Sequence, residues 1–281
     1  MNKNTLPNYS YGDFIPYLNL NITKNVIHQF SNIKYVILQG SGDRTLYLAN
    51  KLLNQIPELN NLLPNSSYVA YKVGNILLAS HGMGSSSILT LLNTLTPLLK
   101  LCNNNFAYIR IGTSGGIGIK AGTVVLTKNS YTADIINGYP IFENNNKIIY
   151  PTTMNLNLNQ DIIKVWLKQS SNFSLIEANT MCADDFYLSQ ARMDGFIRLD
   201  FDNKKQKTYL NILKNNNIAN IEMESGALGY FSNLYNIPAT TISATIVNRL
   251  KTDQVTISPE MVKEYSQRGQ IIIMDYLKNC E

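Results

Sequence analysis

Two short segments each place an arginine among glycines directly after or within an apolar, strand-like run. They are GSGDR, from Gly40 to Arg44, and RIGTSGG, from Arg110 to Gly116. Glycine lets the backbone approach an anion closely, and a guanidinium supplies the planar, permanent charge that suits phosphate. The hydroxyls and N–H groups of the second segment would form an anion nest. Each segment alone is also compatible with a tight turn, but together they predict one oxyanion site formed by residues at the ends of two strands.

A third group, Glu222–Met223–Glu224, stands where a helix is expected to begin. Acidic residues favour a first helical turn and methionine suits a core, so a purely structural role is compatible with this run. Alternatively, one carboxylate accepts hydrogen bonds from a sugar diol while the methionine packs against the sugar.

A fourth group lies between Thr180 and Arg192. Gln190 and Arg192 are two residues apart, so in an extended chain their side chains point the same way. An amide and a guanidinium side by side could read the O2–N3–O4 edge of a pyrimidine, with Phe186 stacked on the ring. By spacing alone, a polar surface loop is as good an interpretation.

The elements that must position these residues follow an alternating pattern of strand-like and helical runs. Strands are expected at 35–39, 69–73, 76–80, 106–111, 123–126, 174–177 and 239–247. Helices are expected at 45–53, 88–101, 160–168, 204–214, 222–234 and 259–278. This alternation predicts one layered α/β domain over residues 1–281.

Composition excludes several classes of protein. The chain has 281 residues, 44% of them hydrophobic, and a net charge of +5, which excludes a disordered chain. Its densest basic run, 203–207, predicts a solvated helix face and no nucleic-acid surface. We expect neither a metal site nor membrane contact. A cytoplasmic location is expected too, with Cys102, Cys182 and Cys280 unpaired.

Six motifs together resemble the nucleoside phosphorylase-I superfamily, particularly its animal-type uridine phosphorylases. They are GSGDR (40–44), SHGMG (80–84), RIGTSGGIG (110–118), TMCADDFYLSQARMDG (180–195), NIEMES (220–225) and TIVNRLKTDQ (245–254). The resemblance implies a three-layer α/β/α domain with a central mixed, twisted sheet. It also implies reversible phosphorolysis of uridine to uracil and ribose 1-phosphate, in pyrimidine salvage. Phosphate is then a co-substrate, no cofactor is needed, and the active sites lie at the interface of a homo-oligomer, with a dimer favoured over a hexamer.

The resemblance assigns roles to individual residues. The phosphate-binding positions are Gly40, Arg44, Arg110 and Thr113. The ribose-binding positions are Glu222, Met223 and Glu224, with Tyr17 supplied by a neighbouring subunit. The base-binding positions are Phe186, Gln190, Arg192, Ile246, Val247 and Arg249. The residues expected to act in catalysis are Arg110, Glu224 and Arg192.

Two positions depart from the family's pattern. Tyr17 stands where the family has a histidine for the ribose 5′-hydroxyl, and Ser67 stands where it has an arginine for phosphate. Lys72 is a candidate to replace that charge. The departures keep open a weakly active or inactive paralogue that binds nucleosides. A purine nucleoside or methylthioadenosine phosphorylase is less favoured, because 245–249 holds no carboxylic acid to protonate a purine.

Overall fold

A mixed sheet of eight strands forms the centre of the molecule, in the order β11-β10-β7-β12-β6-β3-β5-β4. The computed structural model describes residues 8–53, 59–102, 104–169, 172–196 and 202–279. The strands are β3 (Tyr35–Gln39), β4 (Ala70–Val73), β5 (Ile76–Ser80), β6 (Ala107–Gly116), β7 (Val124–Tyr131), β10 (Leu175–Cys182), β11 (Ile218–Glu222) and β12 (Ala239–Asn248). The predicted α/β class with a mixed central sheet is confirmed.

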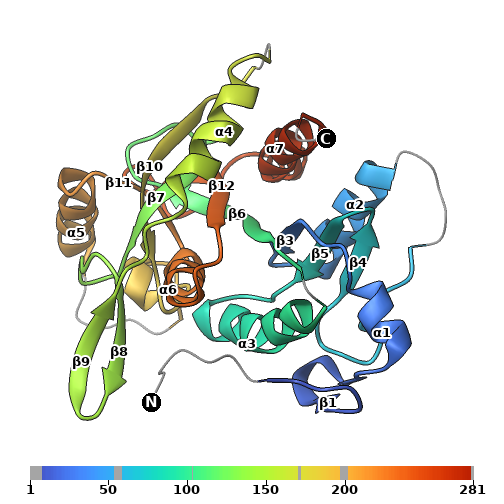
Figure 1. Cartoon of the computed structure of the whole chain (residues 1–281). Helices are drawn as coiled ribbons and strands as arrows, with labels where there is room; N and C mark the ends of the chain where they lie inside the picture. Colours follow the sequence, from blue (N-terminus) through green and yellow to red (C-terminus); the bar gives the residue numbers. More distant parts are fainter. Residues whose placement is uncertain (1–7, 54–58, 103, 170–171, 197–201, 280–281) are drawn as a thin grey trace.

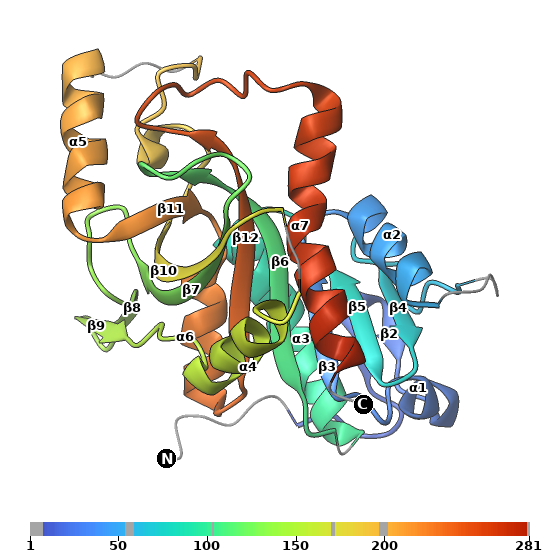
Figure 2. The same ribbon diagram turned by 90° about the horizontal axis from the view of Figure 1, so that it is seen from above.

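One end of the sheet closes on itself. Strand β11 pairs in parallel with β10 and also antiparallel with β6, where Asn220 faces Gly116 and Ile221 faces Gly115. Strands β6, β12, β7, β10 and β11 therefore form a closed ring, while β3, β5 and β4 extend it as an open sheet (Figure 2). This closure brings residues from both halves of the chain to the end of β6.

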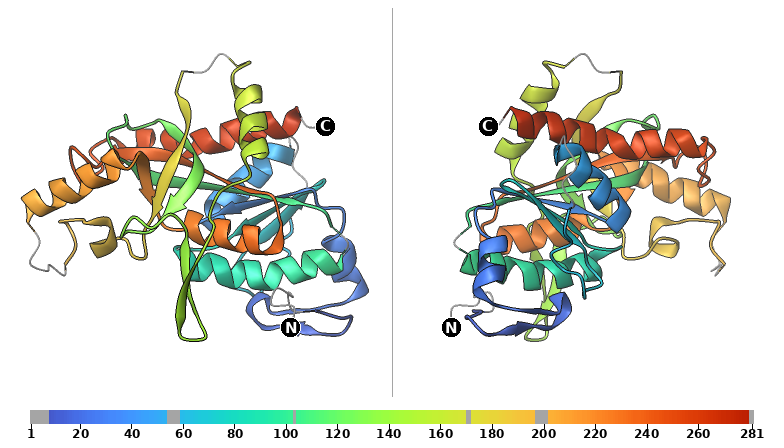
Figure 3. Two further views of the ribbon diagram at one scale, coloured as in Figure 1. Left: turned by 60° about the vertical axis from the view of Figure 1, so that its left-hand side comes forward. Right: turned by 90° about the vertical axis from the view of Figure 1, so that its right-hand side faces the viewer.

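Helices cover both faces of the sheet. Helices α3 (Ser85–Leu101) and α6 (Ser225–Tyr235) pack on one face, and α2 (Gly42–Leu53), α4 (Leu156–Trp166) and α7 (Pro259–Lys278) pack on the other. Figures 1 and 3 show these layers. Strand β3 illustrates the pattern, because Val36 and Leu38 join the core under α3 while Ile37 joins the core under α7.

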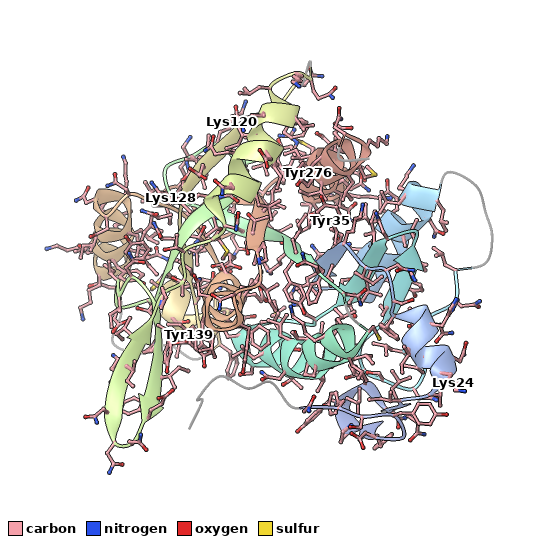
Figure 4. The ribbon with its side chains drawn as sticks, viewed as in Figure 1. Lys24, Tyr35, Lys120, Lys128, Tyr139 and Tyr276 are labelled. Atoms are coloured by element: carbon pink, nitrogen blue, oxygen red, sulfur yellow. The ribbon has the colours of Figure 1, made fainter. Side chains whose placement is uncertain are left out.

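The remaining elements lie outside these three layers. Helix α5 (Asn203–Asn215) packs on β11 through Leu210 and Leu213. The short elements are β1 (Phe14–Ile15), a 3-10 helix η1 (Pro16–Leu18), β2 (Leu20–Asn21), α1 (Lys24–Gln29), and a second 3-10 helix, η2 (Leu188–Gln190). At the other end of the chain, Tyr276 of α7 meets Tyr35 edge to face, with ring centroids 6.0 Å apart (Figure 4).

Several elements were not predicted from the sequence. A hairpin of β8 (Tyr139–Glu143) and β9 (Asn146–Tyr150) projects from the body (Figure 1). Its turn residues Asn144 and Asn145 have φ of 50° and 63°, a conformation that asparagine tolerates well, so the asparagine run looks like a plain loop in the sequence. Strand β11 and the first helix, α1, were also unpredicted.

None of the helices within the described ranges is long and apolar enough to cross a bilayer. Cys102 and Cys182 are buried free thiols, whereas Cys280 lies outside the described residues.

Candidate active site

A cavity of about 200 Å³ gathers the residues singled out in the sequence. Thirteen of the fourteen predicted site residues line it: Gly40, Arg44, Arg110, Thr113, Phe186, Gln190, Arg192, Glu222, Met223, Glu224, Ile246, Val247 and Arg249. Lining residues that had no predicted role are Gly82, Met83, Gly112, Ser114, Gly115, Ile221 and Val255. All of these except Val255 lie inside the six family motifs, and that location could have identified them as site residues.

Two arginines lie close together in the cavity wall. Arg44 lies in the first turn of α2, directly after β3, and Arg110 lies on β6, opposite Leu38 of β3. Burial and the neighbouring charge of Arg110 lower the pKa of Arg44. Burial alone would lower the pKa of Arg110, but the carboxylates of Glu224 and Glu222 outweigh it and raise that pKa. Both side chains therefore stay cationic and can bind an anion.

The glycines of β6 make room for these arginines. A Cβ atom on Gly112 would lie 2.7 Å from Nη1 of Arg110, and one on Gly115 would lie 2.9 Å from Cγ of Arg249. The strand was predicted to end at residue 111, with residues 112–116 forming a loop with an anion nest or a tight turn, and this prediction was wrong. They continue the strand, because β12 pairs with β6 through Ser243 opposite Gly112 and on to the strand end. Thr113 consequently reaches the cavity as a strand residue.

A histidine lies behind the two arginines. His81 follows β5, is fully buried, and neither ring nitrogen has a hydrogen-bond partner among the described residues. Burial, reinforced by Arg110 and Arg44, lowers the pKa of His81 well below 6.5. Its imidazole is therefore neutral at physiological pH.

The two carboxylates do different things. Glu222 ends β11, and its oxygens accept from the backbone N–H groups of Glu224 and Ser225, each at 3.0 Å, and from the Ser225 hydroxyl. Helix α6 thus begins at Ser225, three residues later than predicted, with Glu222 satisfying its first N–H groups. Nη1 of Arg110 lies 2.9 Å from the same carboxylate. Both carboxylate oxygens of Glu222 are therefore already hydrogen-bonded within the protein.

Glu224 instead bridges three elements. One oxygen accepts the backbone N–H of Gly84 at 2.6 Å, and the other pairs with Nη2 of Arg110. Burial raises the pKa of Glu224 and Arg110 opposes that rise. Met223, between the two carboxylates, also lines the cavity.

A second part of the cavity wall, called the base end below, is formed by the segment after β10 together with Arg249. Asp185 accepts the backbone N–H groups of the residues two, three and four positions later, at 2.6–2.9 Å. These bonds precede the 3-10 turn of Leu188–Gln190, and Ala191 follows it with φ of 52°. The predicted extended conformation of 190–192 was wrong. Gln190 and Arg192 nevertheless both line the cavity.

Ion pairs anchor the two arginines of this end. Nε of Arg192 lies 2.8 Å from Oδ1 of Asp194, and the guanidinium lies 4.5 Å from the ring centroid of Phe186. Nε of Arg249 lies 2.8 Å from Oδ1 of Asp253. Neither aspartate was predicted, although each lies inside a quoted motif.

Tyr17 is the predicted site residue that does not line this cavity. It is 63% exposed and lies on η1. Ser67 is exposed as well, and the Ser66 hydroxyl donates to the Tyr17 carbonyl at 2.9 Å, so these two segments share one surface. Lys72 donates to the carbonyl of Ser31 at 2.8 Å and is not among the cavity's lining residues.

Comparison with known proteins agrees with this geometry. The model of the phosphorylase superfamily matches residues 34–278. Human uridine phosphorylase 2 is 32% identical over 269 residues, covering 91% of this chain and 83% of its own. A crystal structure of Schistosoma mansoni uridine phosphorylase in complex with uracil superposes with a TM-score of 0.84 and 31% identity, covering 90% of this chain and 89% of its own.

A relative with a different name matches nearly as well. Inactive uridine phosphorylase B of Schistosoma mansoni is 30% identical over 262 residues, covering 89% of this chain and 86% of its own. Identity at this level does not separate active from inactive members. The family itself is nonetheless shown, since its model spans most of the chain. The chain belongs to the phosphorylase superfamily and, within it, to the uridine phosphorylase branch of the nucleoside phosphorylases.

Proposed function

We propose that this protein is a uridine phosphorylase, which reversibly converts uridine and phosphate to uracil and ribose 1-phosphate. One observation carries the proposal. A single cavity is lined by a pair of arginines, Arg44 and Arg110, by the buried carboxylate of Glu224, and by the amide and guanidinium of Gln190 and Arg192. Phosphate, ribose and uracil present groups complementary to these three sets of side chains.

The charges suit the bond that must break. Cleavage of the C1′–N1 bond builds positive charge on the ribose and negative charge on the base. A phosphate dianion held by Arg44, Arg110 and the hydroxyl of Thr113 would stabilise the first charge and attack C1′. Donors preorganised toward developing charge are among the most effective contributions to catalysis. Glu224 would hold the sugar hydroxyls, which is a positioning effect.

The base end favours a pyrimidine. Gln190 and Arg192 can offer donors to the oxygens of uracil as its negative charge grows. The wall beside them includes Ile246, Val247 and Arg249, none of which is an acid that could protonate a purine. No metal or organic cofactor is needed for this reaction.

The site would be completed by a second copy of the chain. Tyr17 and Ser67, the positions where the family has its cross-subunit histidine and arginine, belong to adjoining segments of one exposed surface. That adjacency supports a homo-oligomer, a dimer by preference, in which this surface reaches the neighbouring cavity. We assign the protein to pyrimidine salvage in the cytoplasm, where thiols such as Cys102 and Cys182 stay reduced.

Uracil release from uridine, followed by ultraviolet absorbance with and without phosphate, tests the proposal. We expect phosphate-dependent release, faster than cleavage of inosine or methylthioadenosine. Deoxyuridine and thymidine in parallel assays would define the sugar preference. Release without phosphate would mean a hydrolase and would contradict the roles of Arg44 and Arg110.

A second candidate is a paralogue that binds nucleosides without efficient turnover. Tyr17 and Ser67 favour it, because a serine cannot replace a charged phosphate ligand, and one relative of similar identity is named inactive. Calorimetric binding of uridine combined with no uracil release would establish this candidate instead.

A further inference from the structure

Asp253, in the turn after β12, is hydrogen-bonded to both arginines of the base end, Arg192 and Arg249. Its Oδ1 accepts from Nε of Arg249 at 2.8 Å. Its Oδ2 accepts from the backbone N–H of Met193 at 2.8 Å and from Nε2 of Gln206 at 2.7 Å. Its backbone carbonyl accepts from Nη2 of Arg192 at 3.1 Å. A single residue, whose side chain is 9% exposed, therefore contacts both arginines and also Met193, directly after Arg192, and Gln206 of α5.

Further hydrogen bonds close this arrangement into a network. Nη2 of Arg249 donates to the carbonyl of Gln190 at 2.8 Å, and Nε2 of Gln206 donates to the carbonyl of Ala191, also at 2.8 Å. Ala191 has a left-handed backbone, which is costly for alanine and needs support from its surroundings. The conformation that brings both Gln190 and Arg192 to the cavity is thus held through Asp253 and its partners.

Among the described residues, the network engages Nε and Nη2 of each arginine and leaves Nη1 for a ligand. Arg192 uses Nε and Nη2 on Asp194 and on the Asp253 carbonyl, and Arg249 uses Nε and Nη2 as described above. Nη1 of Arg249 is buried without a hydrogen-bond partner among the described residues, and both arginines line the cavity. A buried donor without a partner is costly unless a ligand or water meets it.

The network also balances the charges of the two arginines. The two arginines are matched by Asp194 and Asp253, so these four side chains carry no net charge. A neutral environment suits a neutral base, while the unpaired donors still face the charge that develops on cleavage.

We propose that Asp253 is a positioning residue for base recognition, which fixes Arg249 and residues 190–193 and keeps the base end electrically neutral. The inference rests on the proposed function, because it takes the base end to be where uracil binds. Asp253 itself does not line the cavity, so it acts through its partners.

Asp253→Asn is the sharpest test. All three side-chain partners of Asp253 are N–H donors, and they occupy both oxygens. Asparagine has the same shape but only one oxygen, so its NH₂ group must face at least one donor. We expect KM for uridine to rise about 10- to 100-fold, with KM for phosphate within about twofold of the unsubstituted value.

Two further variants test whether the effect is specific to the Asp253 network. Gln206→Ala removes one donor from the network at a half-buried helix position and should raise KM for uridine in the same direction but by less. Asp161→Asn removes an exposed aspartate that pairs with Lys164 on α4, far from the cavity lining, and should change neither KM.

The pH dependence of uracil binding distinguishes a positioning role of Asp253 from a general structural defect. Asp253→Asn leaves the base end with one excess positive charge, so its affinity for uracil, measured by calorimetry, should improve more steeply toward alkaline pH, where uracil becomes anionic. A merely structural defect would give the same pH dependence as the unsubstituted protein. It would also weaken uridine and phosphate equally, and that result would overturn the proposal.

The outcomes also distinguish this inference from the proposed function. If the unsubstituted protein binds uridine without cleaving it, the calorimetric Kd replaces KM and the same fold-change is expected. Unchanged uridine binding in Asp253→Asn would overturn the positioning role alone. If the unsubstituted protein binds neither uridine nor uracil, the proposed function and this inference both fail.

Discussion

Glu224 pairs with Arg110 through one carboxylate oxygen while its other oxygen accepts the N–H of Gly84 at 2.6 Å. Both side chains are buried, at 5% and 4% exposure. The carboxylate expected to hold ribose is therefore bound to the cation expected to hold phosphate. Binding of phosphate to Arg110 must weaken this pair, which would free Glu224 for the sugar hydroxyls.

Glu224→Gln should consequently separate phosphate binding from turnover. The amide removes a negative charge that competes with phosphate, so phosphate should bind about tenfold more tightly, the scale of one charged hydrogen bond. Turnover should fall about 100-fold, because the sugar is no longer well positioned. Calorimetry with phosphate and steady-state kcat measure the two effects, and weaker phosphate binding would contradict the competition.

Gly112→Ala should weaken phosphate binding without removing a charged group. The added methyl would lie 2.7 Å from Nη1 and 2.8 Å from Nη2 of Arg110, which is buried and has little space to move. Overpacking of this kind costs about 1–3 kcal/mol. We expect KM for phosphate to rise about tenfold, with a smaller change in KM for uridine. Equal kinetics for the variant and the unsubstituted protein would show that Arg110 relaxes freely.

Ser67→Arg tests the missing cross-subunit charge. If the surface that carries Tyr17 and Ser67 faces a neighbour's cavity, a guanidinium there adds a charged hydrogen bond to phosphate, worth about 1.5–3 kcal/mol. KM for phosphate should fall about tenfold or more. Asn65→Arg, at an exposed position on the same loop, adds the same charge and is the matched control. An equal effect in both variants would indicate a general electrostatic attraction and no specific contact.

His81 predicts an acid-sensitive fold. Burial, with Arg110 and Arg44, holds the pKa of His81 in the folded protein well below its ordinary 6.5. Below about pH 6.5 the unfolded chain therefore binds one more proton than the folded chain, and stability falls as the pH is lowered. Between pH 6.5 and 5 this loss reaches at most about 2 kcal/mol. His81→Gln should reduce it, as measured by urea unfolding at pH 7.5 and pH 5, and an unchanged pH dependence would mean that other groups titrate.

Much of the site follows from local sequence signals. Strand β3 and the apolar start of β6 are visible as buried runs. Their parallel pairing places Arg110 opposite Leu38, near the end of β3 that Arg44 follows. The Glu222–Glu224 run and the Gln190–Arg192 pair were recognisable because their residue types suit a sugar and a pyrimidine. These predictions depend on residues near one another in the chain and on a regular α/β alternation.

Other features were decided only by contacts between distant segments. Residues 112–116 continue β6 because β12 pairs with them, and β11 became a strand because it bridges β10 and β6. Asp253 accepts hydrogen bonds from Met193, 60 residues before it, and from Gln206, 47 residues before it, and no local periodicity predicts contacts over such separations. The left-handed backbone of Ala191 was likewise not visible as a pattern. By itself, the sequence determined which side chains the site contains. The tertiary structure decided how they are held, because hydrogen bonds and strand pairing between remote residues outweigh local conformational preference.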